Sequence, residues 1–231
     1  MPSMSEIYNK YAIQYDELVN HEDYQGNLQT YLESKIEKGS SVLEFGVGTG
    51  RLTKLYINKA KSAVLCDRSV HMIEQAKKNL HEFLPKIDFK ELDTRRINTI
   101  NGRYNLIVEG WSLGHVALEE YDTLRVFIDE LLKSLNSKLA INGKMIFIET
   151  YGSNVEKPTV PGEKLKAFYE ILEKEHDFKR EIISTDYMFD SIEDAKRIMT
   201  FFFGEEIGNG IKTKKIKEYT GIWERARNNI A

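Results

Sequence analysis

The sequence has very little cysteine or proline and no long hydrophobic run. The 231-residue chain contains one cysteine, Cys66, and four prolines. A single cysteine cannot form an internal disulfide, which excludes a disulfide-stabilised secreted scaffold and favours a reducing compartment. The first residues are polar, and no apolar run approaches the roughly 20 residues of a transmembrane helix. We therefore expect a soluble, cytoplasmic protein with no membrane partner.

Strongly basic segments are also missing. The chain has 33 Lys and Arg against 36 Asp and Glu, a net charge of −3, and its densest basic cluster, Lys212–Lys217, is short. Because nucleic-acid-binding domains carry extended basic patches, nucleic acid is not the favoured partner. The histidines lack a metal-ligand spacing such as H-E-x-x-H, so no metal site is predicted.

What the sequence does have is an alternation of short apolar runs with helical patterns. Five of these runs have the length of strands: Ser41–Phe45, Ser62–Asp67, Ile87–Leu92, Tyr104–Glu109 and Lys144–Thr150. A long helix is predicted over Tyr121–Leu139, with Asn142–Gly143 as its cap and turn. Short apolar strands are typical of a parallel sheet covered by helices on both faces. The pattern predicts a Rossmann-like, doubly wound α/β fold.

The most informative stretch is Val42–Arg51, which reads VLEFGVGTGR. A strand followed by a glycine-rich turn and a helix is how a doubly wound sheet binds a nucleotide-like ligand. Glycine permits the tight turn, and the helix N-terminus offers free N–H groups. However, the G-x-G-x-x-G pattern of dinucleotide sites fails because Arg51 occupies the last position, and Glu44 suits a cationic ligand better than a phosphate.

Taken together, E-x-G-x-G-x-G resembles the first motif of class I S-adenosylmethionine-dependent methyltransferases. The resemblance covers about residues 7–150 and implies a sheet of about seven strands, mostly parallel, with an antiparallel last strand near Ile216–Glu224. It implies S-adenosylmethionine as cofactor and S-adenosylhomocysteine as product. The motif residues expected to bind the cofactor are Glu44, Gly46, Gly48 and Gly50. We expect Glu44 to pair with the ammonium group of the methionine moiety.

Two acidic residues follow the next strands of the predicted sheet. Asp67 ends the second strand and is placed to accept hydrogen bonds from the ribose hydroxyls, with Arg68 beside it and Met72 against the adenine. The alternative is that Asp67 caps the following helix. Asp93 and Thr94 follow the third strand, where the resembled family contacts the adenine edge. There the alternative is an Asx turn before a loop.

The segment after the fourth strand should border the cofactor, because ligands bind outside the carboxyl ends of the strands. It contains Glu109 and Trp111, both predicted to be cofactor contacts, and Leu113-Gly114-His115-Val116, similar to a Leu-x-His-Val segment of the family. His115 is the best general-base candidate, since its pKa lies near neutrality. A packing role for this histidine is the alternative. The N/D-P-P-Y/F motif of base and glutamine methylation is absent.

The N-terminal tyrosines read Tyr-x-x-Tyr-Ala-x-x-Tyr-Asp, similar to the lid segment of many small-molecule methyltransferases. Tyr11 and Tyr15 are predicted to contact the cofactor, because an aromatic face attracts a sulfonium cation. Ordinary packing is the alternative. A helix predicted from Ser191 to Phe203 is followed by a break at Gly204–Gly210. Its three consecutive aromatics, Phe201–Phe203, cannot share one face.

The sequence therefore predicts one methyltransferase domain over residues 1–231. Residues 1–35 form its N-terminal lid, residues 36–150 its cofactor-binding core, and residues 151–231 a C-terminal part with a substrate-side helical insertion around 191–210. The predicted activity is methyl transfer from S-adenosylmethionine to a small molecule of open identity, by a monomer or homodimer. A nicotinamide-dependent dehydrogenase and a non-catalytic cofactor-binding module are the alternatives, and nucleic-acid methylation is a weaker one.

Overall fold

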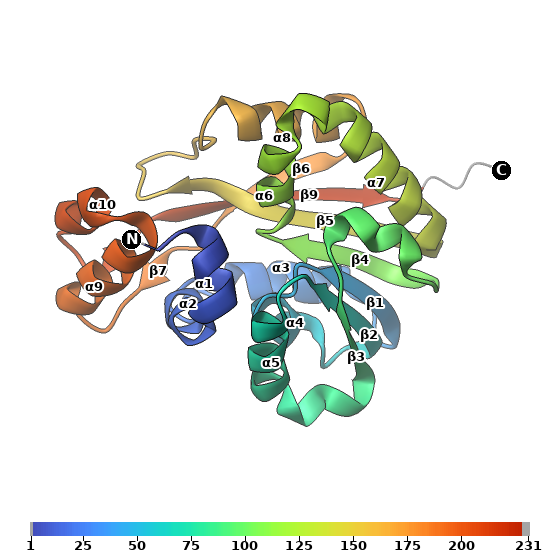
Figure 1. Ribbon diagram of the computed structural model, residues 1–231, viewed down its shortest axis with the longest axis horizontal. Helices are drawn as coiled ribbons and strands as arrows, with labels where there is room; N and C mark the ends of the chain where they lie inside the picture. The colour runs from blue at the N-terminus through green and yellow to red at the C-terminus, as the bar shows by residue number, and fades with distance from the viewer. Residues whose placement is uncertain (1, 228–231) are drawn as a thin grey trace.

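A single seven-stranded sheet organises the protein (Figure 1). The computed structural model describes residues 2–227, so both ends of the predicted domain span, residue 1 and residues 228–231, lie outside the described residues. The sheet order is β3 (Ile87–Glu91), β2 (Ala60–Asp67), β1 (Ser40–Phe45), β4 (Tyr104–Gly110), β5 (Leu139–Ser153), β9 (Glu218–Ala226) and β6 (Lys179–Ser184). Strand β9 runs antiparallel to both neighbours, and the other pairs are parallel. The predicted Rossmann-like sheet with an antiparallel last strand is confirmed.

Side chains alternate between the two faces of the central strands, and each face has its own hydrophobic core. Leu43 and Ile107 pack with α6 (Leu113–Glu119), α7 (Leu124–Lys138) and α8 (Glu163–Lys174). Val42 and Leu106 pack on the opposite face with α3 (Asn27–Lys35) and α4 (Arg51–Tyr56). Helix α5 (Val70–Asn79) contacts β2 and β3. Short 3₁₀ helices span His81–Lys86, Thr94–Thr99 and Tyr121–Thr123.

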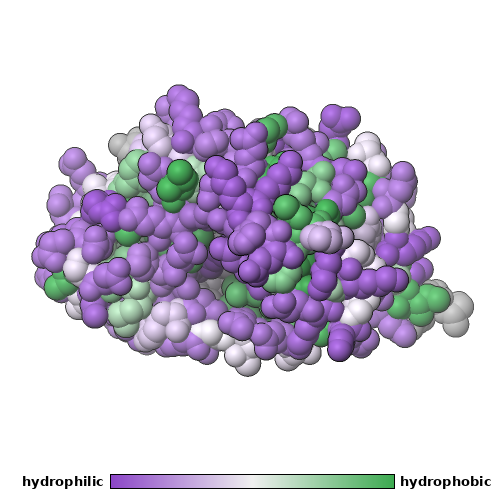
Figure 2. Space-filling model, turned by 90° about the horizontal axis from the view of Figure 1, so that it is seen from below, coloured by the Kyte–Doolittle hydropathy of each residue, from purple (hydrophilic) through white to green (hydrophobic). Residues whose placement is uncertain are grey.

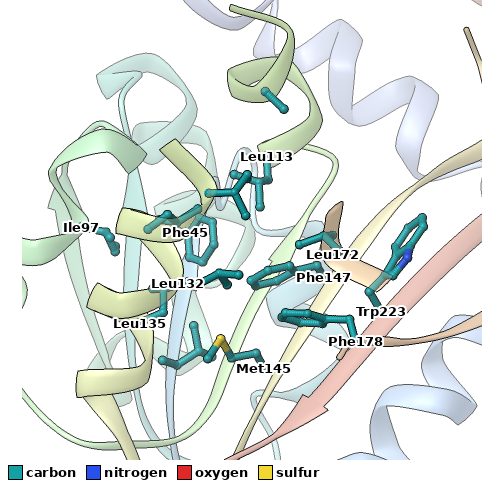
Figure 3. Close-up of a cluster of buried hydrophobic side chains, with 14 of the residues drawn as sticks. Phe45, Ile97, Leu113, Leu132, Leu135, Met145, Phe147, Leu172, Phe178 and Trp223 are labelled. Carbon is teal, nitrogen blue, oxygen red and sulfur yellow. The ribbon is translucent and has the colours of Figure 1, made fainter. Parts of the chain in front are cut away.

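The larger core lies under α7 and α8 and is rich in aromatic rings (Figure 3). Phe147 of β5 stacks on Phe178 with ring centroids 4.9 Å apart. Trp223 of β9 is fully buried and lies against Tyr169 of α8 at 4.3 Å. Full burial of such side chains contributes about 1.5–3 kcal/mol each, so this core fixes β9 against β5.

A third, smaller core joins the N-terminus to a segment inserted between β6 and β9. Helices α1 (Met4–Lys10) and α2 (Ala12–Val19) bury Ile7 and Leu18 against it. The inserted segment contains β7 (Tyr187–Met188), α9 (Ile192–Phe203), α10 (Glu205–Gly210) and β8 (Lys215–Ile216). Figure 1 shows α1 and α2 lying between the central sheet and α9 and α10. Two distant parts of the chain therefore cover one end of the sheet together.

Two local predictions were wrong. Helix α7 ends at Lys138, and Asn142–Gly143 lies inside β5 as an irregular step in its pairing with β4, not as a helix cap. The predicted break at Gly204–Gly210 is the short helix α10. A Cβ at Gly208 would lie 1.7 Å from the Thr200 hydroxyl oxygen. Only glycine at position 208 therefore allows α10 to pack this closely on α9.

Among residues 2–227, no helix is long and apolar enough to cross a membrane. Figure 2 shows one face of the molecule, on which hydrophobic residues are scattered among hydrophilic ones.

Candidate active site

The glycine loop between β1 and α4 approaches the loop after β4 very closely. Gly46 and Gly48 adopt left-handed φ angles of 70° and 54°, which side chains rarely tolerate. A Cβ at Gly46 would lie 2.1 Å from the Ser112 hydroxyl oxygen. Glycine is therefore required here both for backbone conformation and for the contact between the two loops.

A cavity of about 640 Å³ lies at the carboxyl ends of β1, β2 and β4, and we call it the strand-end crevice. Nine of the predicted site residues line it: Tyr15, Gly46, Gly48, Asp67, Arg68, Asp93, Thr94, Trp111 and His115. The crevice is also lined by Tyr8, Leu92, Gly110, Ser112 and Val116. The location agrees with the rule that open α/β sheets bind ligands outside the carboxyl ends of their strands.

Asp67 holds the glycine loop and also faces the crevice. Its carboxylate oxygens accept hydrogen bonds from the N–H groups of Gly48 and Ser69, each at 2.8 Å. Burial raises the pKa of Asp67 above its usual value. A carboxylate has about four lone-pair sites, so Asp67 retains the capacity to accept bonds from a ligand. The Ser69 hydroxyl, not Asp67, caps α5 by accepting from Met72 N–H.

Asp93 caps the 3₁₀ helix that follows β3. Its side chain accepts from Arg95 N–H at 2.9 Å and pairs with the Arg95 guanidinium at 3.1 Å. Arg95 in turn pairs with Glu119 and Glu120 at the end of α6. The local turn weighed as the alternative is present, and Asp93 lines the crevice at the same time.

Glu44 points under helix α4, on the face of the sheet that carries Val42. Its Oε2 accepts hydrogen bonds from the hydroxyls of Thr53 at 2.6 Å and Tyr56 at 2.5 Å. Burial raises the pKa of Glu44 to about 7. The carboxyl does not line the strand-end crevice. It lines a smaller cavity of about 270 Å³ beside the glycine loop, which we call the glycine-loop pocket.

The remaining predicted residues lie outside the lining of the crevice. Tyr11 packs edge-on against Phe201 of α9, with centroids 5.4 Å apart, and Met72 is buried beneath α5. Gly50 adjoins Leu80, which lies 2.8 Å from the place of a Cβ. Glu109 accepts bonds from Ser112 and from Leu113 N–H, and therefore holds the start of α6.

A second buried carboxyl supports the same helix. Glu149 of β5 accepts a hydrogen bond from Gly114 N–H at 2.5 Å. Burial raises the pKa of both Glu109 and Glu149, and the charge of Glu109 raises that of Glu149 further. Together the two carboxyls fix the first turn of α6, which carries His115.

His115 lies at the boundary between the crevice and the N-terminal helices. Its Nε2 is 3.2 Å from the Tyr8 hydroxyl, and burial lowers the pKa of the imidazole. A neutral imidazole in contact with a phenol can accept a proton at neutral pH.

Beyond His115 lies a second cavity of about 780 Å³, which we call the lid-side pocket. It is covered by α1, α2 and α9 and shares Tyr8, Tyr15, Trp111 and His115 with the strand-end crevice. Trp111 adopts a φ of 55°, which is unusual for a bulky residue and sets its indole between the cavities. Phe202 and Phe203 of the predicted aromatic triplet line this pocket, whereas Phe201 packs on Tyr11.

Sequence reasoning missed several residues of these cavities. Arg51 stacks over Trp111 at 3.7 Å and pairs with Glu22 at 2.7 Å, and it lines both the lid-side and glycine-loop pockets. Thr49 lines the glycine-loop pocket, and its buried hydroxyl has no hydrogen-bond partner among residues 2–227. The position of Arg51 at the start of α4 was a usable signal. The sequence around Glu22 gave no such signal, since only tertiary folding brings Glu22 to the site.

Comparisons with known proteins agree with this geometry. Residues 42–136 match a family model described as a methyltransferase domain. The chain is 29% identical over 188 residues to an uncharacterized methyltransferase of Anoxybacillus flavithermus, covering 78% of this chain and 82% of that protein. Given the sheet order, the glycine loop and these matches, the chain has the class I methyltransferase fold, and residues 42–136 are similar to a methyltransferase domain.

Two solved structures share this fold. The complex of DhpI with SAH has a TM-score of 0.58 at 15% identity, covering 97% of this chain and 95% of that chain. The N-methyltransferase NodS from Bradyrhizobium japonicum WM9, in complex with S-adenosyl-L-homocysteine, has a TM-score of 0.52 at 17% identity, covering 96% of this chain and 100% of that chain.

Proposed function

We propose that this protein is a methyltransferase that binds S-adenosylmethionine in the strand-end crevice and transfers its methyl group to a small molecule in the lid-side pocket. The observation that carries the proposal is the common wall of the two cavities, formed by Tyr8, Tyr15, Trp111 and His115. Methyl transfer needs a donor site and an acceptor site that meet at the reacting atoms. Holding two reactants in line supplies up to roughly 7–11 kcal/mol in intramolecular models.

The residues around the crevice fit this cofactor. Asp67 lies where a ribose would meet the end of β2, and Asp93 and Thr94 lie beyond it at the end of β3. The glycine loop lies close to the lid, since a Cβ at Gly48 would stand 3.8 Å from the Tyr15 ring and narrow the space between them.

The glycine-loop pocket fits a zwitterionic aminoacyl tail. It offers a carboxyl at Glu44, a guanidinium at Arg51 and the unpartnered hydroxyl of Thr49. An ammonium and a carboxylate on one ligand would find partners of opposite charge here, whereas a diphosphate would face Glu44. This contrast favours an aminoacyl adenosine ligand over a dinucleotide.

The bound sulfonium supplies the activated methyl group. The protein's part is to exclude water, to orient the acceptor, and to remove a proton where the acceptor must lose one. Tyr8 and Tyr15 close the space between the cavities from the N-terminal side, and their rings favour a cation beside them. His115 takes the acceptor proton through the Tyr8 hydroxyl, which receives the proton from the acceptor as it passes its own to Nε2.

A ligand comparison tests the proposal. S-adenosylhomocysteine at a hundredfold excess over its Kd should raise the Tm by about 5–10 °C, and NADH should not. Labelled S-adenosylmethionine incubated with the protein and a metabolite extract should give a labelled small molecule. Stabilisation by NADH alone would indicate a dehydrogenase. Binding of S-adenosylhomocysteine without any turnover would indicate a non-catalytic module. Label found in RNA would indicate a nucleic-acid methyltransferase.

A further inference from the structure

An unpartnered carboxyl stands in the wall of the lid-side pocket. Glu218 begins β9 opposite Ser153 at the end of β5, and both residues line the pocket. Glu218 is only 2% exposed, and its Oε2 has no hydrogen-bond partner among residues 2–227. The Ser153 hydroxyl interacts with the same carboxyl and favours its ionised form. A buried polar atom without a partner is costly, so this oxygen is suited to bind a ligand donor.

The residues that line the pocket include two carboxyls, Glu22 and Glu218, but only one guanidinium, Arg51. Glu22 and Arg51 form an ion pair at 2.7 Å, and the Arg51 guanidinium also lies over the Trp111 ring. The only other titratable base among the lining residues is His115, whose pKa is lowered by burial. The charge of Arg51 also lowers the pKa of Glu218, so one cation serves two carboxyls, and a fully ionised pocket would carry one net negative charge.

Apart from Thr150 and Ser153, the rest of the lining is apolar or aromatic. Its side chains share a large carbon surface and come from α1, α2, β7, α9 and the loop after β4: Met4, Tyr8, Tyr15, Leu18, Val19, Trp111, Tyr187, Phe202 and Phe203. Aromatic faces of this kind attract a cation as well as an apolar frame. The pocket thus combines one unmatched carboxyl with a hydrophobic enclosure.

We propose that the methyl acceptor carries a basic nitrogen on an apolar or aromatic frame, and that Glu218 binds this nitrogen as an ammonium. This inference rests on the proposed function, because the bound amine is a methyl acceptor only if the protein transfers methyl groups. Glu218 acts in recognition, whereas proton removal at the reacting atom stays with His115. An alcohol or carboxylate of the same frame would lack the charge that Glu218 selects.

The proton balance of binding is simple. Burial and the charge of Glu22 raise the pKa of Glu218, against the opposite effects of the Ser153 hydroxyl and the Arg51 charge, and so favour the protonated carboxyl. A neutral amine takes this proton and becomes the ammonium that pairs with the carboxylate. An amine that arrives already protonated displaces the proton to solvent. No covalent bond changes in either case.

Calorimetry with matched probes tests this binding in the wild-type protein, in the presence of S-adenosylhomocysteine. The probes are 2-phenylethylamine and 4-phenylbutylamine, each against the alcohol of the same chain length. We expect each amine to bind roughly 10- to 100-fold more tightly than its alcohol. Equal affinity for amine and alcohol would overturn the inference without any variant being made.

Two variants assign the preference to its residue. E218Q is isosteric with the protonated carboxyl and should remove the preference for amines while leaving alcohol binding unchanged. Met4→Ala, at a lining residue that is 40% exposed and has no aromatic ring, should weaken amines and alcohols equally. Amine binding that survives in a folded E218Q protein would also refute the assignment. Failure of S-adenosylhomocysteine to bind would refute the proposed function alone, because the amine comparison can be repeated without it.

Discussion

The hydroxyl of Tyr8 and Nε2 of His115 lie 3.2 Å apart, although 107 residues separate them in the chain. Tyr8 belongs to α1, and His115 belongs to the helix that Glu109 and Glu149 hold in place. The pair stands in the wall common to both cavities. A hydrogen bond therefore joins α1 to α6 in the wall that the two cavities share.

Replacing His115 by Asn should lower turnover by roughly 10²- to 10⁴-fold if the imidazole removes a proton from the acceptor. Affinity for S-adenosylhomocysteine should stay within about threefold, because the other cofactor contacts are unchanged. Steady-state kinetics and calorimetry measure the two effects. His81→Asn, at an exposed histidine, is the matched control, and full activity of His115→Asn would reduce His115 to a packing role.

The pH dependence of kcat at saturating S-adenosylmethionine, where the ionisation of Glu44 no longer limits cofactor binding, should follow the lowered pKa of His115. Desolvation, with Arg68 nearby, disfavours the imidazolium and so lowers this pKa below 6.5. The neutral, active form is therefore kept down to pH 6.5, and activity should fall only as the pH drops further. Rates measured between pH 5 and pH 8.5 check this. An acidic limb centred above pH 6.5 would contradict the assignment of His115 as the base.

Glu44→Gln should weaken S-adenosylhomocysteine binding by roughly 10- to 100-fold, because the variant cannot ionise to meet an ammonium. Since the pKa of Glu44 is raised to about 7, wild-type affinity should increase between pH 6 and pH 8 as the carboxyl ionises. The variant should lose this dependence.

Tyr56→Phe separates binding from folding at the same carboxyl. It removes one hydrogen bond to Glu44 but keeps the ionisable group. It should therefore lower the Tm while leaving the Kd for S-adenosylhomocysteine nearly unchanged. Calorimetry at several pH values and thermal unfolding measure both quantities. Wild-type affinity in Glu44→Gln at pH 8 would leave Glu44 with only its contacts to α4.

Gly46→Ala should destabilise the protein by about 2–4 kcal/mol, since it combines a left-handed backbone with a collision against Ser112. Gly39→Ala is the matched control: its φ is 89°, but a Cβ there meets nothing within 4 Å. That control should cost only the backbone strain, about 1–2 kcal/mol. Denaturant unfolding of both variants gives the comparison, and equal losses would mean that the two loops do not meet as described.

Local sequence patterns were sufficient where each residue depends on its own neighbours. The apolar runs predicted β1, β2, β4 and β5, and the glycine spacing located the loop that borders the crevice. Asp67 and Asp93 could be found because each follows a strand, and parallel strands end on one edge of the sheet. Similarly, Ser191 was placed correctly at the start of α9, where its hydroxyl accepts from Asp194 N–H.

Patterns failed where a close approach of distant backbone overrides local preference. Asn142–Gly143 has the composition of a turn, but it lies inside β5. There the backbone comes so close to β4 that a Cβ at Gly143 would lie 2.9 Å from the Tyr104 carbonyl oxygen. Helix α7 ends at Lys138 because Leu139 is already extended and pairs with Tyr104 of β4. Neither contact can be read from spacing, because the partners are far away in the chain.

The sequence by itself determined the strands of the sheet, the glycine loop and the acidic residue before it, since strand pattern and turn chemistry are local properties. Only the tertiary structure decided what surrounds that loop. It turned Glu44 under α4, paired Glu22 with Arg51, and brought Glu218 into the same pocket as Tyr8. The physical reason is that α1, α2 and the inserted segment bury their apolar faces in a small core of their own, which no periodicity in either segment specifies.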